Sequence, residues 1–383
     1  MKNNFFISQT FPLTKIINFL LTGILLVFIL SCSKDDESPS KPEIIENEII
    51  ATLDSVLANT HVPGIVAGVW APNENIELIY TGGTSDLETG APMDADMVFR
   101  MGSNTKTITI TILLKLVDSG LISLNDTLSK YIPDFPRADE VTIEMLCNMK
   151  SGIFNYSEDP DWYERLTQEP EHVWTYDELL SYAAENEYYF DPGTGYHYSN
   201  SNTILIGKLI EQISGKSLKD WITDEIIIPL GLKNTGYLPS GTDLPGFHAK
   251  GYYMNEYNPE DPEYTSYYDI SWAGPAGAAY STLEELKKYA VKLVGGGLLS
   301  PELQQIRLNS MKPMENPYGV TYGIGMFEYK GFYGHNGSLP GFTSLMIHSP
   351  SRNCTIVIWY NSQLPDNPTH LLAIIPHIIY KDL

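Results

Sequence analysis

Apolar, β-branched segments lie near both ends of this chain, and helix-type segments occupy the region between them. Four strand-type segments span residues 65–70, 76–80, 342–348 and 354–360, and a short turn separates the members of each pair. Segments from both ends can share one sheet only if the chain leaves that sheet and returns to it. The sequence therefore predicts an antiparallel sheet formed from both chain ends.

The middle of the chain carries the periodicity and the capping residues of helices. We predict helices over residues 44–58, 175–184, 203–213, 281–295 and 371–380. Thr175 with Glu178, and Ser281 with Glu284, have the spacing of a capping box at a helix N-terminus. The predicted fold is α+β, with helices flanking the sheet and an all-helical lobe inserted between its halves. A groove between two lobes is a common place for a site.

The N-terminus has the features of a targeting segment. Lys2 and Lys15 are the charged residues before an apolar stretch over residues 16–30, and Cys32 follows a small residue. This order resembles a bacterial lipoprotein signal, and an uncleaved anchor helix is the alternative. The resemblance implies attachment to the cell envelope at the outer membrane, facing the periplasm or the surface. It divides the chain into a signal peptide over 1–31, a lipidated Cys32 with a linker over 32–43, and a folded domain over 44–383.

The net charge excludes one class of partner. The chain has 24 Lys and Arg against 47 Asp and Glu, which makes the formal net charge -23 and the pI about 4.6. Such a surface repels nucleic acid and anionic head groups. No cluster of His, Cys, Asp and Glu has metal-ligand spacing, so we expect neither metal nor cofactor. We expect a monomer in which Cys147 and Cys354 are separate buried thiols rather than a disulfide.

Ser103 and Lys106 form a candidate nucleophile and base. They precede an apolar run over residues 108–117 that ends near Gly120. If a helix begins near Ser103, Lys106 lies one turn later on the same face. A serine hydroxyl needs a nearby base, and burial or a helix dipole can lower the pKa of a lysine enough for that task. Residues 107–112 alternate like a strand, so the helix prediction rests on the residues that follow them.

Tyr198 and Asn200 belong to a second polar motif, Tyr-Ser-Asn, which lies just before the predicted helix over 203–213. A phenol near a lysine ammonium can lose and regain a proton, so Tyr198 can pass the Ser103 proton to a leaving group. The side-chain amide of Asn200 offers a donor and an acceptor to a substrate amide.

A third motif, His335-Asn336-Gly337, lies before the strand segment over 342–348. Gly337 lets a substrate approach the backbone closely. The Ser338 N–H can then pair with the Ser103 N–H as an oxyanion hole. Each motif alone also has an ordinary structural explanation, and their combination carries the prediction.

In this order and at these separations, Ser-x-x-Lys, Tyr-x-Asn and His-x-Gly resemble the serine β-lactamase and D,D-peptidase superfamily. Tyr-Ser-Asn is similar to class C β-lactamases, and His-x-Gly is closer to the D-alanyl-D-alanine carboxypeptidase and esterase branches. The resemblance implies a serine hydrolase domain over 44–383 that acts through an acyl-enzyme on a peptidoglycan-type peptide or another small amide or ester. It implies Ser103, Lys106 and Tyr198 as catalytic residues. The implied substrate-binding residues are Asn200, Trp272, His335, Asn336, Gly337 and Ser338.

The chain departs from β-lactamases in the charge of the third motif. Those enzymes hold the substrate carboxylate with the lysine of Lys-Thr-Gly, where this chain has His335, which is charged only below about pH 6.5. Between Tyr322 and the terminal segment the basic residues are Lys330 and Arg352. We therefore expect D,D-carboxypeptidase or ester hydrolysis, weak β-lactamase turnover, and better binding of carboxylate-bearing substrates as the pH falls towards 6.

Other functions stay open at this point. A β-lactamase or an esterase of the same fold fits the motifs equally well. A Ser-His-Asp hydrolase is disfavoured because Gly-x-Ser-x-Gly is absent. The non-enzymatic alternative is an envelope lipoprotein that binds glycans or peptides through the tyrosine-rich segment over 252–272.

Overall fold

The computed structural model describes residues 39–253, 263–265, 267–314, 319–363, 370–381 and 383. Apart from residues 39–41, these belong to one unit, Pro42–Leu383. The predicted signal peptide and Cys32 lie outside the described residues, as does most of the predicted linker. Within the described ranges, no helix is long and apolar enough to cross a membrane.

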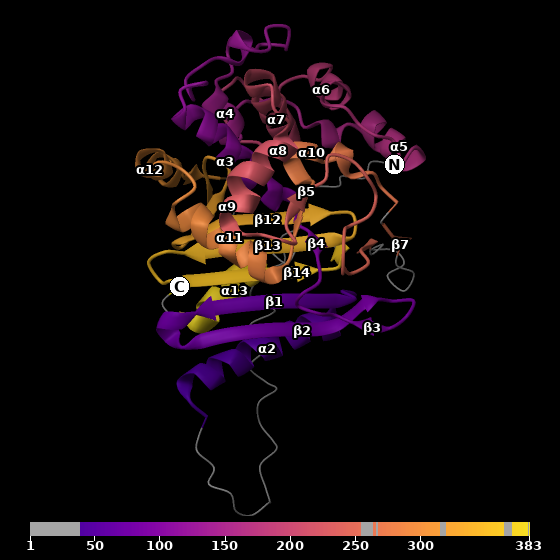
Figure 1. Ribbon diagram of the computed structural model, residues 1–383, viewed down its shortest axis with the longest axis vertical. Helices are drawn as coiled ribbons and strands as arrows, with labels where there is room; N and C mark the ends of the chain where they lie inside the picture. Colours follow the sequence, from indigo (N-terminus) through magenta and orange to yellow (C-terminus); the bar gives the residue numbers. More distant parts are fainter. Residues whose placement is uncertain (1–38, 254–262, 266, 315–318, 364–369, 382) are drawn as a thin grey trace, which may run out of the picture. The chain divides into compact units, whose positions relative to one another are not determined.

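Strands from both ends of the chain form one antiparallel sheet (Figure 1). Its strands in the described residues are β1 Gly64–Ala71, β2 Ile76–Asp86, β3 Ala91–Pro92, β9 Lys312–Pro313, β10 Thr321–Tyr322, β11 Phe327–Tyr329, β12 Phe332–Leu339, β13 Phe342–Ser349 and β14 Cys354–Tyr360. The strand order is β3-β2-β1-β14-β13-β12-β11-β10-β9. β1 pairs with both β2 and β14, and Ile65 lies opposite Tyr360. The predicted sheet from both chain ends is therefore confirmed.

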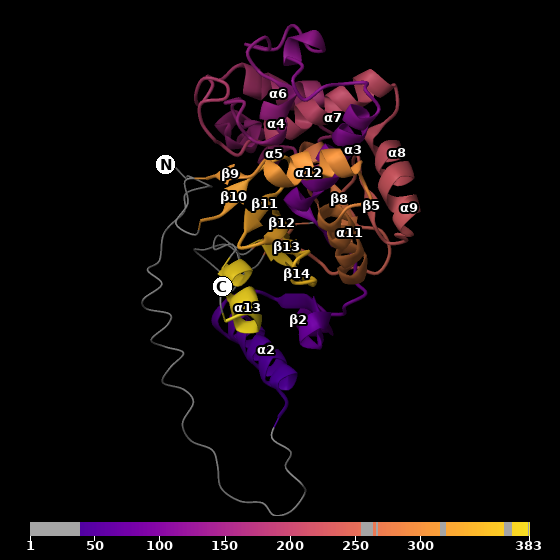
Figure 2. The same cartoon turned by 90° about the vertical axis from the view of Figure 1, so that its left-hand side faces the viewer.

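Both faces of the central strands are buried, which explains why their sequences are continuously apolar. Ile65 and Val69 of β1 pack with α2 (Lys41–Asn59) and α13 (His370–Ile379), whereas Val66 and Trp70 pack with the core that contains α11 (Leu283–Gly295). Successive side chains of a strand point to opposite faces, so one strand supplies both cores. In Figure 2, α2 and α13 lie together on one side of the sheet and α11 on the other.

Helices fill the middle of the chain, as predicted. They gather on one side of the sheet, and α3 lies between that lobe and the strands (Figure 1). The helices are α3 Thr105–Asp118, α4 Ile143–Cys147, α5 Pro160–Gln168, α6 Tyr176–Ala184, α7 Asn200–Ser214, α8 Leu218–Ile222, α9 Ile228–Leu230, α10 Gly274–Gly277 and α12 Pro301–Asn309. Short strands make two small sheets: β4 Phe99–Arg100, β8 Ala279–Ser281 and β5 Gly236–Tyr237, and then β15 Ser362–Gln363, β6 Tyr252–Tyr253 and β7 Glu263–Tyr264.

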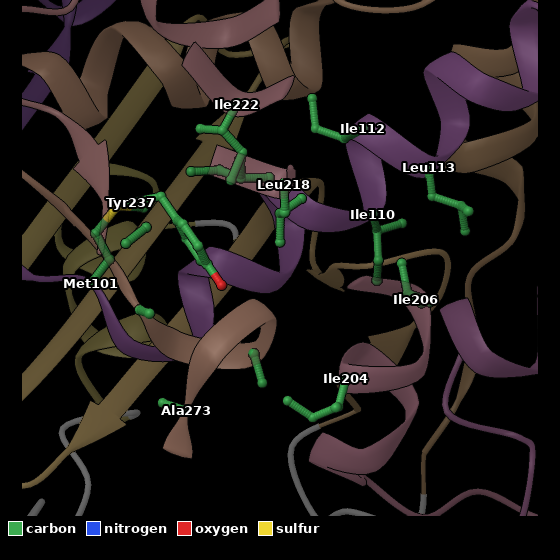
Figure 3. Close-up of a cluster of buried hydrophobic side chains, with 14 of the residues drawn as sticks. Met101, Ile110, Ile112, Leu113, Ile204, Ile206, Leu218, Ile222, Tyr237 and Ala273 are labelled. Atoms are coloured by element: carbon green, nitrogen blue, oxygen red, sulfur yellow. The ribbon is translucent and has the colours of Figure 1, made fainter. Parts of the chain in front are cut away.

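The core around α3 draws apolar side chains from several elements. Figure 3 shows labelled side chains from α3, α7 and α8 in one cluster: Ile110, Ile112, Leu113, Ile204, Ile206, Leu218 and Ile222. Every residue of Met101–Leu114 is buried except Ser103. The start of α3 is therefore buried on all sides, and its polar side chains need hydrogen-bond partners within the protein.

The alternating Thr and Ile residues at the start of α3 lie in a buried helix, where the threonine hydroxyls bond to nearby carbonyls. Thr107 Oγ1 donates to the Asn104 carbonyl and Thr111 Oγ1 to the Thr107 carbonyl, three and four residues earlier. Thr109 Oγ1 donates to the Pro275 carbonyl, outside the helix. Such bonds let a buried helix carry hydroxyls without leaving them unsatisfied. The helix prediction for this segment is therefore confirmed.

One capping prediction is right and one is wrong. Thr175 and Glu178 form the expected capping box at the start of α6. Ser281 does not cap α11, because it belongs to β8 and lies opposite Phe99 in the sheet. The N-cap of α11 is Thr282, whose side chain makes no capping hydrogen bond. Local spacing could not reveal that a strand pairing holds Ser281.

Candidate active site

Ser103 stands at a tight approach between the start of α3 and strand β12. It lies in a 3₁₀ turn, Gly102–Asn104, that leads directly into α3. Gly102 has φ +55°, and a Cβ there would lie 2.9 Å from the Ser338 backbone nitrogen. Only glycine fits this position without strain. The result is a serine that is partly exposed within an otherwise buried segment.

Lys106 is positioned one helical turn after Ser103 with its amine on the serine hydroxyl. Its Nζ lies 3.0 Å from Ser103 Oγ and 2.9 Å from the carbonyl oxygen of Ala276 in α10. The side chain is fully buried, and burial lowers the pKa of Lys106 well below its usual value. When the amine is neutral, its N–H can donate to Ala276 and its lone pair can accept the Ser103 proton.

Tyr198 faces Lys106 from the residue before the N-cap of α7. Lys106 Nζ lies 4.9 Å from the centre of the Tyr198 ring. The phenol oxygen is buried and makes no hydrogen bond to any group that the structure describes. Burial raises the pKa of Tyr198, and the nearby Ser103 hydroxyl lowers it by a smaller amount. Tyr198 is thus a neutral phenol that can donate a proton beside Ser103.

The register of β12 directs the Ser338 N–H away from β13. Leu339 and Phe342 are the hydrogen-bonded pair that closes a two-residue turn. Because bonded and non-bonded pairs alternate along an antiparallel ladder, the next pair, Ser338 and Thr343, does not exchange hydrogen bonds. β11 pairs only with the residues up to Gly334. Beyond that point, β12 packs against the segment that leads into the Ser103 turn, since a Cβ on Gly337 would lie 2.0 Å from the Met101 carbonyl oxygen. Gly102, the residue before Ser103, also approaches the Ser338 nitrogen, so Ser338 lies beside the Ser103 turn.

His335 is buried and neutral, and this corrects the expected substrate cation. Its Nδ1 lies 2.5 Å from the Asn336 carbonyl oxygen, so Nδ1 carries the proton, and the Tyr322 hydroxyl donates to Nε2 over 3.1 Å. Burial first, and then the charge of Lys106, lower the pKa of His335 to about 3, although the bond to Asn336 opposes this. The expected gain in carboxylate binding near pH 6 therefore loses its physical basis, because a His335 of this pKa is uncharged there.

Asn200 is held by residues that the sequence did not single out. Its backbone N–H donates to Asn155 Oδ1 over 3.0 Å, and its Nδ2 donates to Ser157 Oγ over 2.9 Å. Asn155 Nδ2 in turn donates to Glu158 Oε1 over 3.0 Å. These three residues come from the turn between α4 and α5, which carries no sequence motif that identifies it. A carboxylate thus lies two hydrogen bonds from Asn200.

The Glu158 carboxylate is ionised and partly accessible, with 28% of the side chain exposed. Burial acts to raise the pKa of Glu158, but hydrogen bonds from His197, Asn155 and Tyr189 outweigh it and lower that pKa. At strand β12, Gln363 Nε2 donates to Ser338 Oγ over 3.2 Å. Both residues add polar groups to the site that sequence spacing could not assign.

Trp272 lies behind the site rather than on its surface. It is 8% exposed, and its ring centre is 5.6 Å from that of Trp162. Its carbonyl oxygen accepts a hydrogen bond from the buried Tyr156 hydroxyl. The structure thus gives Trp272 a packing role and leaves little of it for a substrate. Asn336 is partly exposed on β12, as a substrate-facing residue would be.

The two cysteines of the described chain are separate. Cys147 and Cys354 are free and buried, which confirms the expected pair of thiols. Burial raises the pKa of both, so neither is a ready nucleophile.

The fold and the three motifs define the class of serine β-lactamases and penicillin-binding proteins. The family model for Beta-lactamase matches residues 49–375, and the chain belongs to that family. PbpX of Bacillus subtilis is 26% identical over 266 residues, and protein flp of Staphylococcus aureus is 25% identical over 329 residues. These matches cover 69% and 82% of this chain and 62% and 63% of the relatives, so the chain spans just under two thirds of their length.

Solved structures of amide hydrolases share the fold. The D-amino acid amidase of Ochrobactrum anthropi SV3, in complex with D-phenylalanine, is 25% identical with a TM-score of 0.76, and the match covers 88% of this chain and 99% of that one. A D-stereospecific amidohydrolase from Streptomyces sp. has a TM-score of 0.77 at 24% identity, over 90% of this chain and all of that chain.

Proposed function

We propose that the protein is a serine hydrolase that forms an acyl-enzyme on Ser103 and cleaves amides of D-amino acids, including D-alanyl peptides. The observation that carries the proposal is the contact between a partly exposed Ser103 and a fully buried Lys106. A buried amine with a lowered pKa is a base at neutral pH, and a serine beside it is activated.

The arrangement supports a complete acyl-transfer cycle. The Ser103 proton moves to Lys106 Nζ as Oγ adds to the substrate carbonyl carbon, and the Ser103 and Ser338 amides stabilise the oxyanion. The carbon–nitrogen bond then breaks, the leaving nitrogen takes the Tyr198 proton, and Lys106 returns a proton to Tyr198. Water hydrolyses the acyl-enzyme and restores the Ser103 hydroxyl.

Electrostatics favours a substrate that carries an ammonium group and lacks a carboxylate near the reacting bond. The hydrogen bonds and ring contacts of Ser103, Tyr198, Asn200 and His335 in the described structure involve no cation except Lys106. Glu158, by contrast, is an ionised carboxylate on the Asn200 side of the site. Amides of free D-amino acids match this charge pattern, and the D-amino acid amidase of similar fold supports the choice.

We expect D-alanine amide to be hydrolysed with a kcat/KM at least about 10-fold above that of N-acetyl-D-alanine amide. A charge-assisted hydrogen bond contributes about 1.5–3 kcal/mol, and each 1.4 kcal/mol is tenfold. Glu158→Gln should remove this preference, whereas Glu77→Gln, at an exposed carboxylate on β2, should keep it. Steady-state rates for these amides, for D-alanyl-D-alanine and for nitrocefin test the assignment. Faster turnover of nitrocefin or of the free-carboxylate dipeptide would contradict it.

We further propose that the protein is a lipoprotein of the cell envelope, on the strength of the signal-like residues before Cys32. Cys32→Ala should leave the protein unlipidated and either released or unprocessed. Labelling cells with a palmitate analogue, followed by fractionation, measures both effects, with Cys147→Ala as the control that keeps its label. A Cys32→Ala protein that still takes up the label and stays in the envelope would refute this part of the proposal.

A further inference from the structure

Arg307 of α12 is a fully buried arginine that contacts the helix carrying Lys106. Its Nη1 donates to Thr111 Oγ1 over 2.8 Å, and its Nη2 donates to the Thr107 carbonyl over 3.2 Å. On another side, its Nε donates to the Ile324 carbonyl over 3.1 Å. The guanidinium therefore joins α3 to the segment between β10 and β11.

No carboxylate of the described chain neutralises this charge. The titratable groups around the guanidinium are Tyr289 of α11, Cys147 of α4 and Tyr322 of β10. Burial raises the pKa of all three, so they are neutral. Burying an unpaired charge costs free energy, and a well-packed apolar residue is often at least as stable. Stability alone thus gives no reason for an arginine at this position.

The hydrogen-bond partners of Arg307 lie close in sequence to two parts of the site, the Ser103–Lys106 segment and the residues that contact His335. Thr107 directly follows Lys106, and its hydroxyl donates to the carbonyl of Asn104, the residue after Ser103. Ile324 lies two residues after Tyr322, whose hydroxyl donates to His335 on β12. The same arginine thus bonds to the helix of the nucleophile and to the segment that supports the His335 strand.

The far end of α3 is attached to α12 separately. Ser300, the N-cap of α12, donates through its backbone and its hydroxyl to the Asp118 carboxylate at the last residue of α3. Arg307 therefore acts on the end of α3 that carries Lys106, while Ser300 holds the other end.

We propose that Arg307 is a positioning residue for acylation, which holds Ser103 and Lys106 on α3 in register with the oxyanion-hole strand β12. This inference rests on the proposed acyl-enzyme function. Reacting groups must be placed closely, and a shift of about 1 Å can cost on the order of 10²-fold in rate. Three directional bonds from one planar group suit this task, which a lysine cannot reproduce.

The test is the rate at which an activated phosphonate modifies Ser103 in the full-length protein. Arg307→Met should lower that rate by on the order of 10²-fold. Arg307→Lys should fall between Arg307→Met and wild type, and Thr111→Val, which removes one of the three acceptors, should cause a smaller loss. The KM for D-alanine amide should stay within about twofold of wild type, since the loss concerns kcat. Arg137→Met, at a surface arginine paired with Glu140 and Asp191, is the matched control.

The possible negative results distinguish an error in the positioning role of Arg307 from an error in the proposed function. If wild type is labelled at Ser103 and both Arg307→Lys and Thr111→Val react at the wild-type rate, the positioning role is overturned. It is also overturned if the labelling rates of the variants fall only in step with their Tm, because the loss in Arg307→Met then reflects unfolding. If wild type itself is not labelled at Ser103, the proposed function fails, and the inference built on it fails as well.

Discussion

Ser103→Ala is expected to abolish covalent labelling by an activated phosphonate or a fluorescent penicillin and to lower amide hydrolysis by on the order of 10⁴–10⁶-fold. The reason is geometric, because Ser103 is the partly exposed residue of a buried segment and its Oγ lies 3.0 Å from Lys106 Nζ. Among the described residues, the other group bonded to that amine is the Ala276 carbonyl, which is not a nucleophile. Intact-protein mass spectrometry shows whether one mass equivalent is added, and peptide mapping shows where.

A second serine of the same region provides the control for Ser103→Ala. Ser119 is exposed at the C-cap of α3, where its hydroxyl donates to the Lys115 carbonyl. Ser119→Ala should be labelled and active like wild type. Ser103→Ala should unfold near the wild-type Tm, so that lost activity cannot be explained by misfolding. Mapping of the label to another serine in Ser103→Ala would disprove the mechanism.

Lys106→Met is expected to lower the acylation rate of Ser103 by about 10²–10⁴-fold while raising the Tm. The activity loss is that of a missing general base. The stability gain follows from linkage, because the folded-state pKa of Lys106 lies well below its unfolded value. Between those two pKa values, Lys106 is protonated in the unfolded chain and neutral in the folded protein, so the free energy of unfolding rises with pH across this range. Below the unfolded pKa, Lys106 therefore destabilises the folded protein. A neutral methionine of similar length escapes this cost.

The pH profile separates the base role from a structural one. Wild-type kcat/KM should fall as the pH drops through the lowered pKa of Lys106, because the protonated amine cannot accept the Ser103 proton. Lys106→Met should lose this limb of the profile. Lys115→Met, on the same helix but in a partly exposed ion pair with Glu225, should keep both the limb and the rate. An unchanged acid limb in Lys106→Met, or a wild-type acylation rate, would assign the base to another group.

Patterns local in the sequence predicted several elements of this fold closely, although strand β12 was not among them. The strand over 354–360 has the predicted bounds, and the two N-terminal strands and the terminal helix differ from prediction mainly at their ends. Helix α7 begins at Asn200 rather than Thr203, so the Tyr-Ser-Asn motif itself forms the helix start. Such elements are predictable because hydrophobic periodicity and turn residues act over a few neighbouring positions.

The chemical state of the site could not be predicted in the same way. Spacing predicted that Ser103 and Lys106 share a helix face, and the motif order brought Tyr198 and His335 into the same site. Spacing did not reveal that His335 stays neutral well below pH 6.5, because its pKa depends on burial and on Lys106, a residue 229 positions away by number (335 minus 106). It also gave no reason to choose Glu158 or Arg307, which lie outside every motif.

The sequence by itself determined the sheet from both chain ends, the inserted helices, and the identity and order of the residues that meet at Ser103. Only the tertiary structure decided the protonation states of these residues and the hydrogen bonds that hold them in place. The bond of buried Lys106 to Ala276 of α10, the Tyr322 bond to His335 Nε2, and the bond of the Asn200 N–H to Asn155 all join segments far apart in the chain. Desolvation and hydrogen bonding act through space, so these properties exist only once packing has removed water from the groups concerned.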